Sequence, residues 1–215
     1  MSSALILASA SPRRRELLTQ AGYRFEVEPS SVVESRRPGE DAIRFATRLA
    51  REKAEEIFAR HTPSTTPVMV LGADTVVVCD GEIMGKPADA ADAARMLLLL
   101  SGRTHQVVTG VAVVWGIGSA EVAAEMTQVT MRTLSSQEVA DYVAGGEPID
   151  KAGAYAILVI NDRGDTDDLE VRWATGRRTR VRRGCRVQRV ATRRPLQHRA
   201  GGTELHPTDA NHRHR

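Results

Sequence analysis

Residues 70–78 read Val-Leu-Gly-Ala-Asp-Thr-Val-Val-Val, a run that is typical of a buried strand. Its β-branched residues predict a central strand of a sheet that is covered on both faces. A carboxylate inside such a strand is costly to bury unless a cation or hydrogen-bond donors compensate it. Gly72 and Ala73 carry little side chain just before Asp74, which favours close approach of a ligand or metal. We therefore interpret Asp74 as a functional carboxylate; the alternative is a strand-end aspartate that caps a turn.

The N-terminal segment predicts an anion-binding site at the start of a helix. A short buried strand at residues 4–8 leads to Ser11, which can cap a helix that has Pro12 at its first position. Backbone N–H groups and the helix dipole attract anions at such a point. Arg13 and Arg14 oppose the dipole there, so an anion such as phosphate is expected to offset their charge. The alternative is an ordinary helix start with solvated arginines.

Apolar periodicity and capping signals predict four helices. The N-terminal helix is expected to turn Leu17 toward the core, and two longer helices are expected at residues 40–60 and 88–100. A fourth helix is predicted to start after Ser135, with Glu138 at the capping-box position. Further strands are expected at residues 25–28, 83–84, 105–114 and 120–131.

Other candidate site residues lie in polar segments and on one helix face. Glu34 belongs to a polar loop that is expected to be mobile, and Arg48 and Lys53 of the second helix can flank a pocket. Lys86 lies between Gly and Pro on a stiff loop, but this triplet is not a Walker motif, which needs a longer glycine loop. His105 stands at a strand start, where a lone histidine is more often structural.

Length and composition narrow the class of protein. A chain of 215 residues is expected to form one domain or two small ones. No apolar run reaches the about 18–20 residues of a membrane span, and no signal peptide is recognised at the N-terminus. Cys79 and Cys185 lie far apart in different contexts, which indicates a reducing cytosol rather than a disulfide framework.

The net charge of +3 is an average over two unlike regions. Residues 1–157 contain 16 Lys and Arg against 20 Asp and Glu. Residues 158–215 contain 14 Arg and no Lys against 7 Asp and Glu, and they show no sustained period of a helix or strand. This asymmetry predicts a structured domain at 1–157 and a separate Arg-rich, disordered tail at 158–215.

Six short segments occur in a fixed order in the first region. They are Ser9-x-Ser11-Pro12-Arg13-Arg14; Gly72-Ala73-Asp74-Thr75; Gly85-Lys86-Pro87; Leu100-Ser101-Gly102 with His105; Thr109-Gly110; and Glu147-Pro148-x-Asp150-Lys151-Ala152-Gly153-x-Tyr155. Together they resemble the Maf family of nucleoside triphosphate pyrophosphatases, over residues from about 4 to 157. Each segment is a weak signal alone, whereas the ordered set is highly specific.

The resemblance implies an α/β fold, with a twisted mixed sheet and flanking helices in two lobes around a cleft. It also implies a cytoplasmic hydrolase acting on acid anhydrides, which converts a nucleoside triphosphate to the monophosphate and diphosphate with a divalent metal, Mg or Mn. The expected partner is the nucleotide itself, with no membrane, and a homodimer is left open.

Cleavage between the α- and β-phosphates needs charge neutralisation on the leaving diphosphate and an activated water. From the residues, Asp74 binds metal or accepts the proton of that water; by resemblance it is the proton acceptor. Glu34 is expected to hold the metal together with Asp74. The residues expected to bind substrate are Ser9, Ser11, Arg13, Arg14, Lys53, Thr75, Lys86, Asp150 and Lys151.

The residue after the aspartate separates branches of the family. Thr75 resembles the branch that acts on dTTP and UTP, whereas Gln there would indicate the branch that acts on 7-methyl-GTP. Arg13 matches the first specificity position of the family. The third, normally Gln, is Leu158 in this chain.

The resemblance stops after Ile157. Family members continue through Gln-Gly to a segment like Asn-Val-Val-Gly-Leu-Pro and a closing helix, and this sequence contains neither. Arg without Lys, scattered His and Pro, and lost periodicity suggest translation in a shifted reading frame near codons 157–160. On this hypothesis, an uncovered sheet edge and apolar face reduce stability and activity.

Three functions compete. A pyrophosphatase for dTTP and UTP, with modified nucleotides as further substrates, is favoured. The alternatives are a house-cleaning pyrophosphatase for ITP or XTP, and a nucleic-acid-binding protein that uses the basic tail. The last is disfavoured because the Arg runs lack interleaved aromatic residues: Trp173 is the only aromatic residue of the tail.

Overall fold

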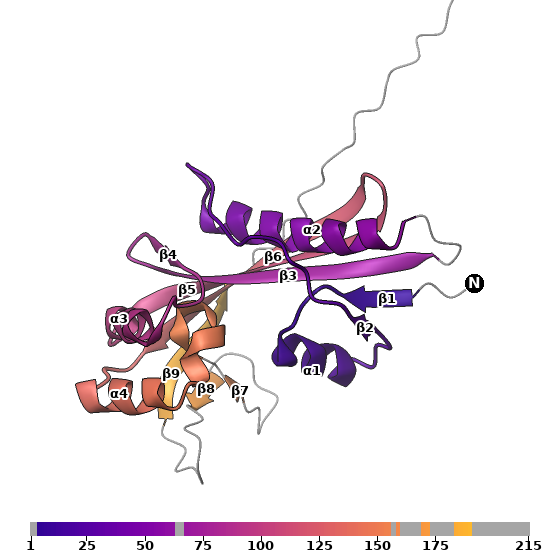
Figure 1. Cartoon of the computed structure of the whole chain (residues 1–215). Coiled ribbons are helices and arrows are strands. Elements are labelled where there is room, and N and C mark those ends of the chain that lie inside the picture. The colour runs from indigo at the N-terminus through magenta and orange to yellow at the C-terminus, as the bar shows by residue number, and fades with distance from the viewer. Residues whose placement is uncertain (1–3, 63–66, 156–157, 160–168, 173–182, 191–215) are drawn as a thin grey trace, which may run out of the picture.

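The computed structural model describes residues 4–62, 67–155, 158–159, 169–172 and 183–190. Their strands form one mixed sheet in the order β2-β1-β3-β5-β6-β9-β8-β7, with β4 paired to β3. Figure 1 shows helices on both sides of this twisted sheet, as expected from the sequence. The strands are β1 (Ala4–Leu7), β2 (Glu26–Val27), β3 (Val68–Cys79), β4 (Glu82–Met84), β5 (Thr104–Gly116), β6 (Ser119–Met131), β7 (Leu158–Val159), β8 (Leu169–Arg172) and β9 (Arg183–Val190). The helices are α1 (Pro12–Gln20), α2 (Ala42–Arg60), α3 (Ala90–Leu100) and α4 (Ser136–Ala144), followed by the 3-10 helices η1 (Glu147–Asp150) and η2 (Ala152–Ala154).

The strand predicted at residues 70–78 is confirmed as the central part of β3. It pairs parallel with β1 on one side and antiparallel with β5 on the other, so that Asp74 lies opposite Gly110. Val70, Val76 and Val77 are fully buried, as a strand covered on both faces requires.

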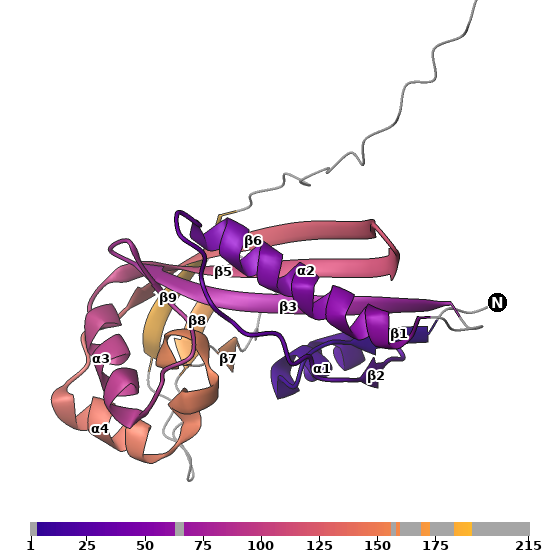
Figure 2. The ribbon, with the colours of Figure 1, turned by 45° about the horizontal axis from the view of Figure 1, so that its top comes forward.

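Helix α2 packs along one face of β3 and β5, and α1 lies on the other side of the sheet below β1 and β2 (Figures 1 and 2). The close packing of α2 depends on two glycines. A Cβ on Gly72 would lie 2.1 Å from the Ala50 carbonyl oxygen, and one on Gly110 would lie 2.5 Å from the Ala46 carbonyl. The interpretation of Gly72 as an approach point for a ligand is therefore wrong, because the backbone of α2 fills that space.

The core is divided between two ends of the sheet. Under α2, Leu49, Ala54 and Ile57 pack on β1, β3 and β5. At the other end, Leu97 and Leu100 of α3 pack with α4 and the 3-10 turns on the end of β3. Figure 2 shows this second group of helices set apart from α1 and α2. The chain thus has the two lobes that the resemblance implied.

The capping signals were mostly predictive. The capping box of Ser135 and Glu138 is present, and Asp41 caps α2. Ser11 holds the N-cap position of α1, with Pro12 next, but its side chain makes no capping hydrogen bond. The expectation that Leu17 faces the core is wrong: its side chain is 64% exposed. Helix α1 is short and polar around most of its circumference, and it has no buried residue.

Parts of residues 158–215 extend the sheet. Strand β9 pairs antiparallel with residues 126–131 of β6, and β8 and β7 follow it. In these short segments β9 pairs with backbone groups at an edge of β6 that would otherwise be unpaired. The rest of the tail, including Trp173, lies outside the described residues. Within the described part of the chain, no helix is long and apolar enough to cross a membrane.

Candidate functional site

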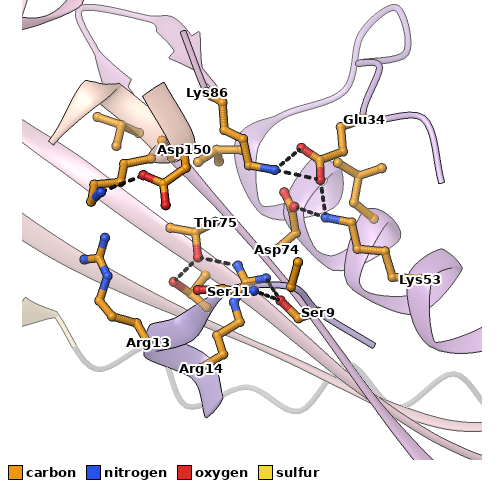
Figure 3. A pocket seen from close by; sticks show the side chains of 18 of the residues that line it. Ser9, Ser11, Arg13, Arg14, Glu34, Lys53, Asp74, Thr75, Lys86 and Asp150 are labelled. Atoms are coloured by element: carbon orange, nitrogen blue, oxygen red, sulfur yellow. Dashed lines mark hydrogen bonds and ion pairs between the residues drawn. The ribbon is translucent and has the colours of Figure 1, made fainter. Parts of the chain in front are cut away.

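A cavity of about 990 Å³ opens between the two lobes. Its lining comes from the start of α1, from α2, from the middle of β3, from the loop after β4 and from the segment that contains η1 and η2. All the substrate-binding and metal-binding candidates line it: Ser9, Ser11, Arg13, Arg14, Glu34, Lys53, Asp74, Thr75, Lys86, Asp150 and Lys151. Figure 3 shows these side chains converging from distant parts of the sequence.

The centre of the site is an ion-paired triad. Lys53 Nζ donates to Asp74 Oδ1 at 2.6 Å and to Glu34 Oε1 at 2.7 Å (Figure 3). The side chains of Lys53 and Asp74 are each 8% exposed, whereas that of Glu34 is 36% exposed. Lys86 Nζ also lies 3.3 Å from both oxygens of Glu34. The buried lysine is therefore the compensating cation that a carboxylate within β3 requires.

The pKa values of the two carboxylates of the triad are shifted in opposite directions. Burial raises the pKa of Asp74 above its usual 3.8, and the charge of Lys53 opposes this rise only in part. Burial also acts to raise the pKa of Glu34, but hydrogen bonds and charge from Lys53 and Lys86 outweigh it and lower that pKa below 4.5. The shift raises the basicity of the Asp74 carboxylate relative to an ordinary aspartate, as suits a proton acceptor.

Arg13 and Arg14 are adjacent in sequence but differ in their contacts. Arg14 donates to Ser9 Oγ at 3.0 Å, to the Ala73 carbonyl at 2.8 Å and to Thr75 Oγ1 at 3.2 Å. These bonds fasten the start of α1 to β3. Arg13 is exposed and has no hydrogen bond or ion pair to the described residues. In Figure 3 its guanidinium lies on the same side of the cavity as Asp150, opposite Glu34 and Lys53.

The far side of the cavity is formed by the glycine-rich segment after α4. Lys151 Nζ pairs with Asp150 Oδ1 at 2.6 Å and also donates to the Glu147 carbonyl. The Asp150 side chain is 66% exposed, and that of Lys151 is 13% exposed. This ammonium is held by its own loop, within the wall of the cavity.

Some lining residues were not anticipated. Arg36 adds a guanidinium to the cavity, and Thr109 Oγ1 lies 3.1 Å from Thr75 Oγ1. Tyr155, the last residue of the six ordered segments, also lines the cavity, and its hydroxyl is hydrogen-bonded to His105 Nε2. The pairing of β3 with β5 brings Thr109 opposite Thr75, and neither residue type alone indicates this.

Two residues considered at the sequence level lie outside the cavity lining. His105 is buried behind Tyr155, and burial lowers its pKa to about 4, consistent with the structural role predicted for it. Arg48 was expected to flank a pocket with Lys53, but it points instead to the loop before α2. That expectation is wrong for Arg48, because the two positions lie on different faces of the helix.

The donor set fits a small, hard divalent cation. Mg²⁺ is typically held by one or two carboxylates together with substrate phosphates and water, and Asp74 and Glu34 supply two carboxylates at one end of the cavity. Among the described residues there is no group of three or more His, Cys, Asp and Glu that could hold a metal alone. A metal here would thus depend on oxygens from the ligand as well.

The cavity has the features of a polyphosphate site: several cations surround a buried carboxylate of raised pKa. A protein-family comparison identifies residues 4–161 as "Maf-like protein". The chain belongs to the Maf family.

The relatives include three bacterial proteins named dTTP/UTP pyrophosphatase. That of Koribacter versatilis (strain Ellin345) is 48% identical over 172 residues, which cover 80% of this chain and 82% of the relative. That of Salmonella typhimurium is 54% identical over 153 residues (71% and 76%), and that of Geobacter sulfurreducens is 52% identical over 154 residues (71% and 78%). A solved nucleoside-triphosphatase / dITP/XTP pyrophosphatase from Mycobacterium abscessus is similar only distantly, at 18% identity and a TM-score of 0.38 over 61% of this chain and 75% of that one.

Proposed function

We propose that this chain hydrolyses dTTP and UTP to the nucleoside monophosphate and diphosphate. The observation that carries the proposal is the buried carboxylate of Asp74, held by Lys53 in a cavity whose remaining charges are mostly cationic. The names of the relatives support the substrate class, since they are about half identical to this chain over most of their length. Thr75, beside Asp74, supports the dTTP and UTP branch.

The cationic side chains of the cavity would bind the substrate in different ways, according to their positions. Arg13 and Lys86 lie at the rim. Among the described residues, Arg13 has no hydrogen-bond or ion-pair partner, and Lys86 pairs only with Glu34. Both can turn to phosphate oxygens at little cost, and the guanidinium fork of Arg13 can bind two oxygens at once. Lys151 is fixed by its ion pair with Asp150, on the side of the cavity where the Arg13 guanidinium lies. Together they would neutralise the charge that develops on the leaving diphosphate.

Asp74 would act as the general base. A water oxygen forms a bond to the α-phosphorus, the bond from that phosphorus to the β-bridging oxygen breaks, and the proton of the water passes to Asp74. Lys53 donates to Oδ1, and no described residue donates to Oδ2, so Oδ2 is available to the water. The raised pKa of Asp74 brings it closer to the operating pH, which makes proton transfer easier.

We also propose that Glu34 and Asp74 hold Mg²⁺ or Mn²⁺ when substrate is bound. Such a cation supplies Lewis-acid stabilisation of the phosphate charge. Lys53 would then keep the two carboxylates in place and offset their mutual repulsion.

A cytoplasmic location is proposed because nucleoside triphosphates are held there. A homodimer remains a proposal that light scattering of the purified chain tests directly.

The experiment is a panel of nucleotides with separate assays for diphosphate and for phosphate. We expect diphosphate release from dTTP and UTP in the presence of Mg²⁺ or Mn²⁺, with little from 7-methyl-GTP, ITP or XTP. A preference for ITP and XTP would assign the chain to the alternative class of pyrophosphatase. Release of inorganic phosphate in place of diphosphate would contradict the proposed bond cleavage.

A further inference from the structure

The loop before α2 is held against that helix by a cluster centred on Arg48. Its guanidinium donates to both carboxylate oxygens of Glu40, at 2.6 and 2.8 Å, and to the Ser35 carbonyl at 2.9 Å. It also donates to Glu52 at 2.9 Å, and Glu52 in turn accepts from Arg37 of the loop at 2.8 Å. One side chain of the helix thus binds the loop at two points directly and at a third through its neighbour.

The cluster is half-enclosed rather than a surface ion pair. The side chains of Arg48 and Glu40 are 15% and 10% exposed. The hydrogen bonds from Arg48 lower the pKa of Glu40 to about 2, so this carboxylate is charged throughout the physiological range. Arg48 also lies over the ring of Phe45, with its Cζ 5.5 Å from the ring centroid. A bidentate pair of this kind fixes geometry as well as charge.

The loop carries Glu34, the residue next to Ser35. Glu34 reaches into the cavity, where it pairs with Lys53, whereas Arg48 does not line the cavity. Arg48 and Lys53 both belong to α2. Lys53 binds the carboxylate of Glu34, and Arg48 binds the backbone carbonyl of Ser35, the next residue. The loop that the polar sequence predicts to be mobile is therefore held in place at Glu34, the proposed metal ligand.

We propose that Arg48 is a positioning residue, which acts through residues 31–40 to place Glu34 for binding the divalent cation. The proposal rests on the proposed function for the role of the cation, but its effect on the loop is independent of turnover. Glu40 and Glu52 are the partners through which Arg48 works. Residues that orient metal ligands in this way typically contribute roughly 10–100-fold to metal affinity or activity.

The first test compares Arg48→Met with Arg51→Met in the full chain. Arg51 is a matched control because it forms an i,i+4 pair with Glu55 on the same helix and has no bond to the loop. Hydrogen–deuterium exchange, read on peptides covering residues 31–40, should be faster in Arg48→Met and unchanged in Arg51→Met. The Mn²⁺ concentration for half-maximal activity should rise by roughly 10–100-fold in Arg48→Met alone.

A double-mutant cycle separates positioning from general stability. If Arg48 acts through Glu34, Arg48→Met in a Glu34→Gln background lowers kcat/KM by no more than about two-fold beyond Glu34→Gln itself. If Arg48 only stabilises the fold, its effect persists at full size in that background, and the proposal fails. Arg48→Met/Glu40→Gln also removes the carboxylate that loses its guanidinium partner in the single variant. This double variant controls for misfolding caused by the remaining charge of Glu40, and residues 31–40 should still exchange fast in it.

The remaining outcomes are also decisive. Arg48→Lys keeps the charge but loses the fork, so it should restore exchange protection and Mn²⁺ activation only in part. Wild-type exchange and wild-type Mn²⁺ dependence in Arg48→Met would overturn the proposal. If the wild type turns over no nucleotide, the proposed function fails; the exchange data on residues 31–40 in Arg48→Met and Arg51→Met still decide whether Arg48 holds the loop that carries Glu34.

Discussion

The two walls of the cavity are built in different ways. On the wall made by α2 and β3, every charged side chain already has a protein partner, as Lys53 has with Asp74 at 2.6 Å. On the wall made by α1 and η1, Arg13 has no partner among the described residues, and Asp150 is 66% exposed. Burial explains the difference, because a charge within the sheet must be compensated inside the protein, whereas a charge at the rim is solvated by water. The paired wall is therefore suited to chemistry, and the rim wall to binding a ligand that arrives with its own charge.

The largest effect is expected from the paired wall. Asp74→Asn keeps the shape of the side chain but removes the proton acceptor, so kcat for diphosphate release from dTTP should fall by about 10²–10⁴-fold. Asp141→Asn on α4, outside the cavity, is the matched control and should turn over at the wild-type rate. Activity of Asp74→Asn near that of the wild type would remove the chemical distinction between the two walls.

The next comparison is between two lysines that contact Glu34. Lys53→Met leaves Asp74 and Glu34 without their shared buried cation, and the free energy of unfolding should fall by about 3–5 kcal/mol. Lys86 is 54% exposed, so Lys86→Met should change stability by less than about 1 kcal/mol while it raises KM for dTTP. Urea denaturation and steady-state kinetics measure both quantities. Equal losses of stability would show that Lys53 is not buried in the way described.

The two neighbouring arginines of α1 give a third comparison. Arg14→Met removes hydrogen bonds to Ser9, Ala73 and Thr75, and should lower the free energy of unfolding by about 1–3 kcal/mol. Arg13→Met removes no bond to the described protein, so its stability should stay within about 0.5 kcal/mol of the wild type. Its KM for dTTP should rise instead. A loss of stability in Arg13→Met, with a rise of KM alone in Arg14→Met, would contradict the roles assigned to these two side chains.

The last comparison concerns the histidine behind the cavity, whose effect depends on pH. Burial lowers the pKa of His105 from 6.5 to about 4, so its neutral form stabilises the fold above pH 6.5, and this contribution is lost as the pH falls toward 4. His105→Asn should therefore flatten the decline of stability between pH 6.5 and 4, as measured by urea denaturation.

Local patterns were enough to predict much of the fold. The β-branched run of β3, the apolar face of α2 and the capping box of α4 each depend on neighbours in sequence, and all three were predicted correctly. Leu17 was misplaced because apolar character alone does not show whether a short helix has anything to pack against. The pairing of β9 with β6 joins residues about sixty positions apart and has no local signal.

The site likewise has features that the sequence predicts and others that depend on contacts between distant residues. Asp74, Glu34, Lys53 and Lys86 were predicted from charge type and motif order, and the structure brings all four together. The different roles of Arg13 and Arg14 could not be predicted, because the partners of Arg14 come from β3, about sixty residues away. The prediction that Arg48 flanks the cavity is wrong for a similar reason, since a sequence does not show which way a helical arginine turns.

The C-terminal region remains a proposal. The family match ends at residue 161, close to the boundary at 157 where the motifs stop. We propose that a shift of reading frame near this point produced the Arg-rich sequence that follows. Resequencing of the locus tests this: a base insertion or deletion that restores the family pattern supports it, and an unbroken frame without such a change contradicts it.

The most direct test of the central claim follows the oxygen of water through the reaction. The purified chain is incubated with dTTP and a divalent cation in ¹⁸O-labelled water, and the products are analysed by mass spectrometry. If Asp74 directs water to the α-phosphorus, one ¹⁸O atom appears in dTMP and none in the diphosphate. Label in the diphosphate or in free phosphate, or the absence of turnover by the wild type, would contradict the proposed chemistry of this cavity.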